Sequence, residues 1–437
     1  MSDLIEALKS DVLLCDGAMG SRVQAMGLDI EVDYGGQENC TEILNRTRPD
    51  IVREIHRGYV ESGSDIIQTN TFGASPITLG EFDLTDEAFD LNQRAARLAR
   101  EVVDEARQAD GIRRYVLGSI GPGTKLPSLG HIAYDDLEAA YRLQADGLIS
   151  GGVDGILIET CQDPLQIKAA VNGAKDARKA AGVDVPVIVQ VTVETTGTML
   201  VGADIAAAAT ILKAMSVDAI GLNCATGPKE MMEHVRFLSE SVDVPITVQP
   251  NAGLPELIDG ETVYPLRPDE LADWLRRFVS DYGVNLIGGC CGTTPEHIQA
   301  LHRMLGNLGR NRRRPEPAPR TPDWTPSIAS LFTQTPLRQE NAVLAIGERC
   351  NANGSRKFRE LQAAENYDAC VAMGRDQEGE GSHAIDLCAA YVGRDEIADM
   401  TALLTRMRGS LTAPLVIDST ELPVLEHALK LYGGKAI

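Results

Sequence analysis

Three of the nine cysteines occur where their thiols could act together. Cys224 follows one short apolar run, and the vicinal pair Cys290-Cys291 follows another. Three thiolates without a histidine are soft ligands, and among common cellular metals they suit Zn²⁺ best. A site with three protein ligands keeps a fourth position for water or substrate, as catalytic zinc sites do. Because three thiolates place net negative charge on the ion, the predicted chemistry is activation of a bound thiol rather than production of hydroxide.

The sequence around the vicinal pair indicates how both sulfurs could face one ion. Adjacent side chains of a regular strand point to opposite faces, so the backbone must leave strand geometry here. Gly288-Gly289 before the pair and Gly292 after it permit that departure. Residues 293–296 (Thr-Thr-Pro-Glu) then predict a helix start, and a helix N-terminus beside the sulfurs favours thiolates. The alternative is that Cys224 is a small buried hydrophobe and the pair is incidental, because a split pattern is weaker than Cys-x-x-Cys.

The elements that would position these thiols form a repeating pattern from residue 11 to about residue 305. Eight short apolar runs alternate with longer segments of helical periodicity; the runs cover 12–15, 65–68, 115–118, 155–158, 187–191, 219–222, 246–249 and 285–288. Short runs that are apolar throughout are typical of parallel strands buried on both faces. Eight such strand–helix units predict an α/β fold, a closed (β/α)8 TIM barrel. The alternative is an open doubly wound sheet, but no Gly-x-Gly-x-x-Gly follows the first run.

Polar or reactive residues follow almost every run. They are Asp16-Gly17, Thr69-Asn70-Thr71, Glu159-Thr160, Thr192 and Glu194, Asn223-Cys224, Gln249 to Asn251, and Cys290-Cys291. In a barrel the carboxyl ends of all strands meet at one mouth, where active sites of this architecture lie. Any one of these residues could simply belong to a polar loop, but the whole series favours a site, with the zinc at the C-terminal mouth.

After residues 1–306, which form the predicted barrel, the composition changes. Residues 307–340 are rich in proline and arginine, which predicts an extended linker over a surface. The cluster 310–314 (Arg-Asn-Arg-Arg-Arg) is expected to be solvated, with a small anion site as the alternative. In residues 341–437 the rhythm restarts with apolar runs at 343–346, 384–387 and 414–418, and a fourth run begins near residue 433. Three and a half units cannot close, so we expect the first part of a second, incomplete α/β barrel.

Charge and composition exclude several classes of partner. The chain of 437 residues has 41 Lys and Arg against 63 Asp and Glu, a formal net charge of −22. A negative field opposes binding to nucleic acid or to an anionic membrane, so neither is expected as a partner. No apolar run approaches the ~18–20 residues of a spanning helix, and the start of the sequence does not look like a signal peptide. Nine cysteines in a chain of this kind predict reduced thiols and a cytoplasmic location.

Specific motifs now resemble a known family. The segments 221–224 (Gly-Leu-Asn-Cys) and 288–293 (Gly-Gly-Cys-Cys-Gly-Thr) resemble the zinc signature of the homocysteine S-methyltransferase family. Residues 16–20, 64–72 and 158–160 fall where that family has its other mouth motifs, so the resemblance covers about 10–305. It implies that Cys224, Cys290 and Cys291 bind zinc and that the sulfur of homocysteine completes the tetrahedron.

The same resemblance assigns the amino-acid end of the substrate. Asp16 and Glu159 match acidic positions that hold homocysteine, and an α-ammonium group entering a partly dry pocket needs a carboxylate partner. A polar turn residue and a solvated loop end are the structural alternatives for these two. Thr69 and Asn70 could line the mouth, although hydrogen bonding at a strand end also explains them.

The second segment is similar to the opening of a pterin-binding barrel. The similarity lies in 346–354 (Ile-Gly-Glu-Arg-Cys-Asn-Ala-Asn-Gly), 385–386 and 417–419, and it implies four candidate pterin contacts: Glu348, Asn351, Asp386 and Asp418. A carboxylate can accept two hydrogen bonds from the amidine edge of a pterin; helix-cap or turn roles are the alternative for Glu348 and Asp386. Cys388 stands where that family usually has Asn, so this contact differs.

The order of the two barrels resembles that of the cobalamin-dependent methionine synthase family. It implies methyl transfer to homocysteine to give methionine, with methylcobalamin as donor, bound by a module not in this chain. Methyltetrahydrofolate, held by the second segment, would be the source of the methyl group. Two alternatives stay open. One is a stand-alone homocysteine S-methyltransferase that uses S-methylmethionine or a betaine-like donor; the other is a non-catalytic zinc- or thiol-binding fragment.

Overall fold

A computed structural model describes residues 2–258, 261–309 and 313–437. Its largest sheet contains β1 (Leu13–Leu14), β2 (Ile66–Gln68), β3 (Tyr115–Ile120), β4 (Gly155–Cys161), β5 (Val187–Val191), β6 (Ala219–Asn223), β7 (Ile246–Gln249) and β10 (Leu286–Ile287). The strands are all parallel, in the order β1-β10-β7-β6-β5-β4-β3-β2. A parallel bridge between Cys15 and Ile66 joins the two ends of this order. The predicted (β/α)8 barrel is therefore confirmed, and each of the eight apolar runs overlaps one strand.

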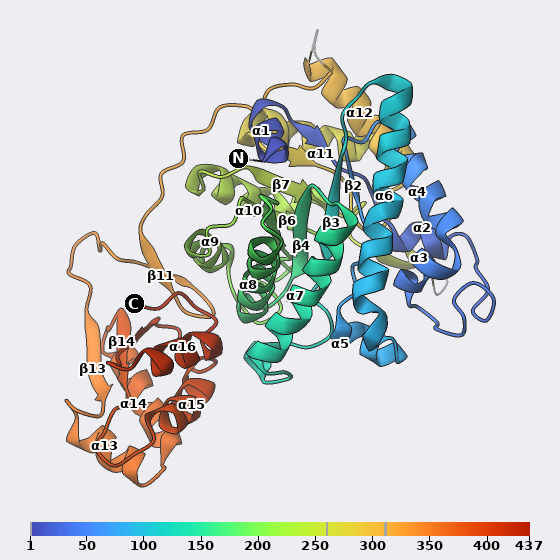
Figure 1. Cartoon of the computed structure of the whole chain (residues 1–437). Helices are drawn as coiled ribbons and strands as arrows, with labels where there is room; N and C mark the ends of the chain where they lie inside the picture. Colours follow the sequence, from blue (N-terminus) through green and yellow to red (C-terminus); the bar gives the residue numbers. More distant parts are fainter. Residues whose placement is uncertain (1, 259–260, 310–312) are drawn as a thin grey trace.

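One long helix follows each strand and packs on the outside of the barrel (Figure 1). These helices are α4 (Pro49–Glu61), α6 (Ala88–Asp110), α7 (Tyr134–Gly151), α8 (Pro164–Ala181), α9 (Ile205–Ala214), α10 (Pro228–Ser241), α11 (Pro268–Tyr282) and α12 (Pro295–Gly309). Local sequence sets their ends. In α8 the Asp163 side chain accepts the Leu165 N–H, Pro164 occupies the first turn, and Gly182 ends the helix with a φ of +67°.

Shorter elements complete the barrel. Three short helices, α2 (Gly20–Gln24), α3 (Leu44–Thr47) and α5 (Pro76–Leu79), lie in the loops that follow β1 and β2, and the antiparallel pair β8 (Glu256–Ile258) and β9 (Glu261–Val263) follows β7. At the opposite end, α1 (Asp3–Ser10) inserts Leu4, Ile5 and Leu8 among side chains inside the barrel. Helix α1 therefore closes this end of the barrel with apolar contacts, and the polar side chains of the site lie at the other end, the mouth.

The linker differs in part from the sequence-based expectation. Helix α12 continues to Gly309, so the expected boundary at 306/307 falls in its last turn. Residues 310–312 of the arginine cluster lie outside the described residues. The expectation of solvation is wrong for Arg314, which is 3% exposed and whose Nε lies 2.6 Å from Oδ2 of Asp65; Arg313 pairs with the same carboxylate. Burial of the guanidinium is compensated by this pairing, because an unpaired charge could not be buried.

Beyond the cluster, the linker runs to a small hairpin. Strands β11 (Ser327–Ala329) and β12 (Gln334–Pro336) pair antiparallel, and Ala329 packs against Ala207 and Ile211 of α9. In Figure 1 this segment leads from the barrel to the second unit along one side of the molecule. The hairpin therefore fixes where the chain crosses from one core to the other.

The second unit has its own core and a three-stranded parallel sheet. The strands β13 (Ile346–Asn351), β14 (Ala384–Cys388) and β15 (Leu415–Ile417) pair in that order, and the helices are α13 (Arg356–Ala363), α14 (Tyr367–Gly379), α15 (Glu396–Met407) and α16 (Leu422–Leu431). The expected strand at 343–346 is displaced toward the C-terminus. Val343 is 83% exposed, whereas Cys350 and Asn351 pair with β14, so burial rather than the apolar run decides where the strand lies.

Backbone and side-chain bonds join the second unit to the barrel. The half-buried Lys168 of α8 donates to the carbonyl oxygens of Tyr432 and Gly434 at 2.7 and 2.6 Å. Arg408 of α15 donates to the carbonyl oxygen of Pro127 at 3.1 Å. The two units therefore pack against each other as well as being connected by the linker. Among the described helices, none is long and apolar enough to cross a membrane.

Candidate functional site

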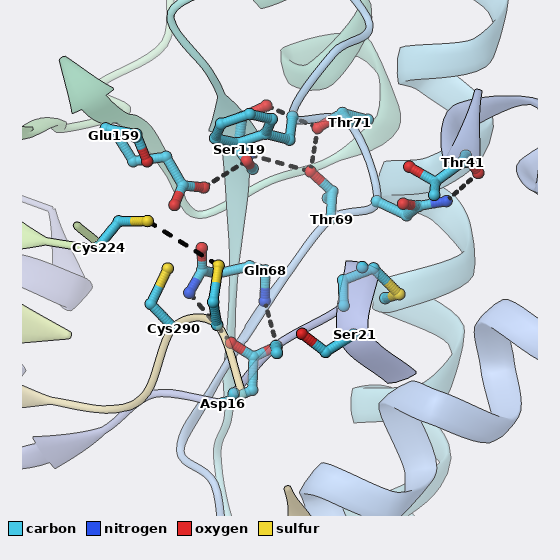
Figure 2. A pocket seen from close by; sticks show the side chains of 18 of the residues that line it. Asp16, Ser21, Thr41, Gln68, Thr69, Thr71, Ser119, Glu159, Cys224 and Cys290 are labelled. Carbon is cyan, nitrogen blue, oxygen red and sulfur yellow. Dashed lines mark hydrogen bonds between the residues drawn. The ribbon is translucent and has the colours of Figure 1, made fainter. Parts of the chain in front are cut away.

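The three cysteines that follow β6 and β10 lie together at the mouth of the barrel. One sulfur from each of Cys224, Cys290 and Cys291 lies within 4.8 Å of the other two, and the Sγ atoms of Cys224 and Cys291 are 3.9 Å apart (Figure 2). All three residues are half-buried, and no disulfide joins them. The structure thus brings together the residues that the sequence singled out, although they are separated by up to 67 positions.

Irregular backbone aims these sulfurs at one another. Strand β10 ends at Ile287, so both members of the vicinal pair lie outside the strand. Gly292 has a φ of +75°, while at Gly289 a Cβ would approach Oγ1 of Thr293 to 2.3 Å. Cys224 itself has a φ of +60°, which is uncommon for a residue with a side chain. Gly292 is thus needed for its backbone conformation, and Gly289 for the close approach of Thr293.

Hydrogen bonds hold the loops of the cluster in place. The Cys290 N–H donates to the carbonyl oxygen of Pro250 at 2.9 Å, and the Cys291 N–H donates to Oδ1 of Asn251 at 3.1 Å. The Thr293 hydroxyl donates to the carbonyl oxygen of Cys290 at 2.6 Å. The loop after β7 therefore supports the loop after β10, and the vicinal pair is fixed from two sides.

Hydrogen bonds among the three thiols shift their pKa values in opposite directions. Hydrogen bonds from Cys224 and then Cys290 lower the pKa of Cys291 well below its ordinary value. The corresponding bonds to Cys224 and Cys291 raise the pKa of Cys290. One sulfur of the cluster is therefore held as a thiolate by two neighbouring thiols, which is the behaviour of a compact group of soft ligands.

Two buried carboxylates share a cavity of about 230 Å³ with the sulfurs. Asp16 is 2% exposed and its Oδ2 accepts the backbone N–H of Gln68 at 2.9 Å; Glu159 is 7% exposed and accepts the Ser119 hydroxyl (Figure 2). Burial raises the pKa of each carboxyl group to about 7. A cation entering the cavity would favour their ionised forms, so the arrangement suits a ligand that carries an ammonium group.

Thr69 and Asn70 line the same cavity, but their polar groups are engaged within the protein. The Thr69 hydroxyl lies 2.6 Å from that of Thr71 and accepts the Ser119 N–H at 3.0 Å. Nδ2 of Asn70 donates to the carbonyl oxygen of Thr41 at 2.8 Å. Both residues therefore shape the wall of the mouth and hold neighbouring loops.

Three further residues contact the site groups and were not assigned a role from the sequence. Ser119 binds Glu159, and Nδ2 of Asn223 lies 3.2 Å from the other oxygen of that carboxylate. The Tyr264 side chain hydrogen-bonds to Cys291, and its ring covers Gly292, where a Cβ would come within 2.2 Å of the ring. Asn223 stands beside a candidate ligand in the sequence and could have been found by that signal. Tyr264 could not, since only folding places it there.

The second unit gathers three of its four candidate residues. Nδ2 of Asn351 donates to Oδ2 of Asp386 at 2.8 Å and to Oδ2 of Asp418 at 3.1 Å. Glu348 is exposed and has no hydrogen bond to these three among the described contacts, because a register shift between Gly347 and Cys350 interrupts β13. Burial raises the pKa of Asp386. The result is a small polar cluster at the carboxyl ends of the three strands.

Cys388 lies beside this cluster. Nδ2 of Asn353 is 3.6 Å from its sulfur, and the residue is 2% exposed. The position that differs from the family pattern is therefore buried and holds a neighbouring loop.

The comparisons with known proteins agree with this fold. Residues 13–305 match the family model described as homocysteine S-methyltransferase, and residues 347–437 match the one described as pterin binding enzyme. The chain is 50% identical over 434 residues to a methionine synthase of Mycobacterium tuberculosis and 49% identical over 441 residues to one of Mycobacterium leprae. These matches cover 99% and 100% of this chain but 36% of each relative, so the chain spans about a third of their length.

A solved structure supports the barrel fold. The homocysteine methyltransferase MmuM from Escherichia coli, in its metallated form, is similar with a TM-score of 0.56 and 24% identity, over 67% of this chain and 96% of that protein. At this identity the similarity concerns the fold alone. The family model that covers most of the chain decides the assignment: the chain belongs to the homocysteine S-methyltransferase family.

Proposed function

We propose that the first barrel transfers a methyl group to the sulfur of homocysteine, giving methionine. The observation that carries the proposal is the shared cavity, in which three cysteine sulfurs lie within 4.8 Å of one another and two buried carboxylates line the same space. The sulfurs suit a thiol, and the carboxylates of the same cavity suit an ammonium group. An α-amino acid with a thiol side chain has both groups in one small molecule.

The donor set fits a zinc ion held by Cys224, Cys290 and Cys291. Three sulfurs this close, one of them favoured as a thiolate, match the ligands that Zn²⁺ prefers, and no histidine competes among them. A zinc ion bound there would keep the sulfur of homocysteine deprotonated and nucleophilic at neutral pH.

The residues of the chain supply binding and orientation. Asp16 and Glu159 accept the α-ammonium group, and their burial makes this attraction stronger than it would be in water. Ser119 and Asn223 hold Glu159 in position. The homocysteine sulfur then attacks the methyl group of the donor, so the new carbon–sulfur bond forms while the bond between methyl and donor breaks. The cavity thereby fixes the geometry in which the sulfur meets the methyl carbon.

The proposed donor is methylcobalamin, carried by a module outside this chain, with methyltetrahydrofolate as the source of its methyl group. Two findings support this assignment: the match of residues 347–437 to a pterin-binding family, and relatives named methionine synthase whose length is almost three times that of this chain. In this proposal Glu348, Asn351, Asp386 and Asp418 contact the pterin. The corresponding domains are 1–306 and 341–437, joined by the linker 307–340.

A metal assay combined with sulfur K-edge spectroscopy tests the zinc site. We expect one zinc per chain, with a fourth sulfur ligand after homocysteine is added. Cys291→Ser should lose the zinc and homocysteine binding, because a serine hydroxyl is a poor ligand for this ion. Cys370→Ala, which removes a buried thiol from the second core, should keep both. One zinc per chain and normal homocysteine binding in Cys291→Ser would contradict the proposal.

Methyl donors separate the alternatives. Activity of the protein with methylcobalamin, and its absence with S-methylmethionine or betaine, supports the proposed donor. Transfer from S-methylmethionine without any cobalamin would instead identify the stand-alone enzyme. Zinc that is bound but unaffected by homocysteine would indicate a non-catalytic zinc-binding fragment.

A further inference from the structure

The amide of Asn223 lies between the carboxylate of Glu159 and the cysteine cluster. This residue is 1% exposed and ends β6, directly before Cys224. Its Oδ1 accepts the Thr160 N–H at 2.8 Å. Its Nδ2 lies 2.8 Å from Oγ1 of Thr160, 3.2 Å from Oε2 of Glu159 and 3.9 Å from Sγ of Cys290. A single planar group therefore contacts both Glu159 and the cysteine cluster.

The backbone that the amide holds is unusual. Thr160 has a φ of +57°, a conformation that β-branched residues rarely adopt. It lies where the pairing of β4 with β5 shifts register, between Ile158 and Cys161. Two hydrogen bonds with Asn223 hold Thr160 in this conformation: the Thr160 N–H donates to Oδ1, and the Thr160 hydroxyl accepts from Nδ2. The position of Glu159, the residue before it, thus depends on the amide.

Ser119 provides an internal contrast. Its hydroxyl donates to Oε1 of Glu159, whereas Asn223 approaches Oε2. Ser119 belongs to β3 and makes no hydrogen bond to the cysteines among the described contacts, while Asn223 is adjacent to Cys224 and near Cys290. In Figure 2, Ser119 lies on the side of Glu159 away from the sulfurs of Cys224 and Cys290. Loss of the Ser119 hydroxyl should remove one hydrogen bond to the Glu159 carboxylate. Loss of the Asn223 amide should also allow the distance between that carboxylate and the cysteine sulfurs to vary.

We propose that Asn223 is a positioning residue that fixes the span between Glu159 and the cysteine cluster, and so selects the chain length of the thiol amino acid. This inference rests on the proposed function. A ligand whose ammonium and sulfur are both held has no freedom to adjust its length if the two ends of the site are rigidly linked. The site then prefers homocysteine, with two methylenes between the α-carbon and sulfur, over cysteine, with one. A methylene held in this way is worth about 10- to 200-fold in discrimination.

The test measures binding rather than turnover. Cobalt(II) replaces zinc, and the dissociation constants of homocysteine and cysteine are obtained from the sulfur-to-cobalt charge-transfer absorption. We expect the wild-type protein to prefer homocysteine by at least about 10-fold. Asn223→Ala and Asn223→Asp should retain one metal per chain but lower this preference by about 5-fold or more, since both lose the donor to Glu159. Ser119→Ala should weaken binding of both thiols by a similar factor and keep their ratio.

A second variant covers the case in which the Asn223 variants fail to fold. In Thr160→Gly the positive φ is easily accommodated, but the hydroxyl that binds the amide is absent. The preference should fall here too, by a smaller factor. An unchanged ratio in folded, metal-loaded variants of Asn223, or in Thr160→Gly if those do not fold, would overturn the inference. Failure of the wild-type protein to bind metal or either thiol would instead overturn the proposed function.

Discussion

Both candidate sites include acidic side chains near the carboxyl ends of parallel strands, but these side chains differ in how far they are exposed to solvent. In the first barrel, Asp16 and Glu159 are 2% and 7% exposed, and burial raises the pKa of both to about 7. In the second unit Asp386 is 8% exposed, but Asp418 and Glu348 are exposed. Eight strands surround the first site and three described strands support the second. The eight strands of the first site thus bury both of its carboxylates, whereas the three strands of the second bury only Asp386 among its three.

The largest expected effect separates the stabilities of the two units. Asp65 is buried under the barrel and pairs with Arg313 and Arg314, so Asp65→Ala leaves two cations without their partner. We expect the barrel to lose about 3–5 kcal/mol of unfolding free energy, measured by denaturant titration. The matched substitution Asp399→Ala removes the partner of Arg394 in the second unit, and it should destabilise that unit instead. If both variants lower one common transition equally, the two cores are not separate folding units.

The next effect concerns ligand binding at the two sites. Glu159→Gln removes the charge that we assign to the ammonium of homocysteine, and its affinity should fall about 100-fold, or about 3 kcal/mol. The matched change Asp386→Asn in the second unit should leave homocysteine binding unchanged. Calorimetry on the zinc-loaded protein measures both. Equal losses in the two variants would show that the assignment of sites to units is wrong.

A smaller effect concerns how the stability of the barrel depends on pH. His56 of α4 is fully buried, and burial lowers its pKa from 6.5 to about 4. Since the unfolded chain takes up a proton below pH 6.5 and the folded one does not until about pH 4, stability is lost as the pH falls through this window. Between pH 6.5 and 5 the loss should be about 2 kcal/mol. His56→Leu should flatten this part of the profile, and an unchanged slope would contradict the assignment.

The smallest effect tests the contact between the units. Lys430 of α16 and Asp135 of α7 form an exposed ion pair at 2.6 Å. Lys430→Ala should cost less than about 1 kcal/mol, because exposed pairs contribute little. Thermal unfolding with and without high salt measures this. A loss much larger than that would mean that the interface depends on this exposed ion pair rather than on the hydrogen bonds of Lys168.

The sequence predicts much of the barrel because its strands are apolar throughout and short. The meeting of Cys224 with the vicinal pair also follows from topology, since parallel strands end at one mouth. Other features depend on tertiary contacts. The burial of Arg314 needs Asp65, a partner 249 positions away, and linker composition alone favours solvation. The exposed Val343 shows that an apolar run forms a strand only where a neighbouring strand can pair with it.

The site shows the same division between local pattern and folded context. Residue types and their positions after apolar runs singled out the thiols, and the family resemblance assigned the carboxylates. The left-handed conformation of Thr160, and the approach of Tyr264 over Gly292, arise only when distant segments pack. Hydrogen-bonding partners that position a functional group are therefore harder to predict than the group itself.

The attachment of the linker has a mechanical consequence. Arg313 and Arg314 grip Asp65 at the amino end of β2, and the Val12 N–H donates to the carbonyl oxygen of Pro315 at 2.9 Å. The start of the linker is thus attached to the barrel at the end opposite the cysteines. A pull from the second unit would first load the hairpin on α9, and any strain passed further along the linker would reach this end of the barrel rather than the sulfur cluster.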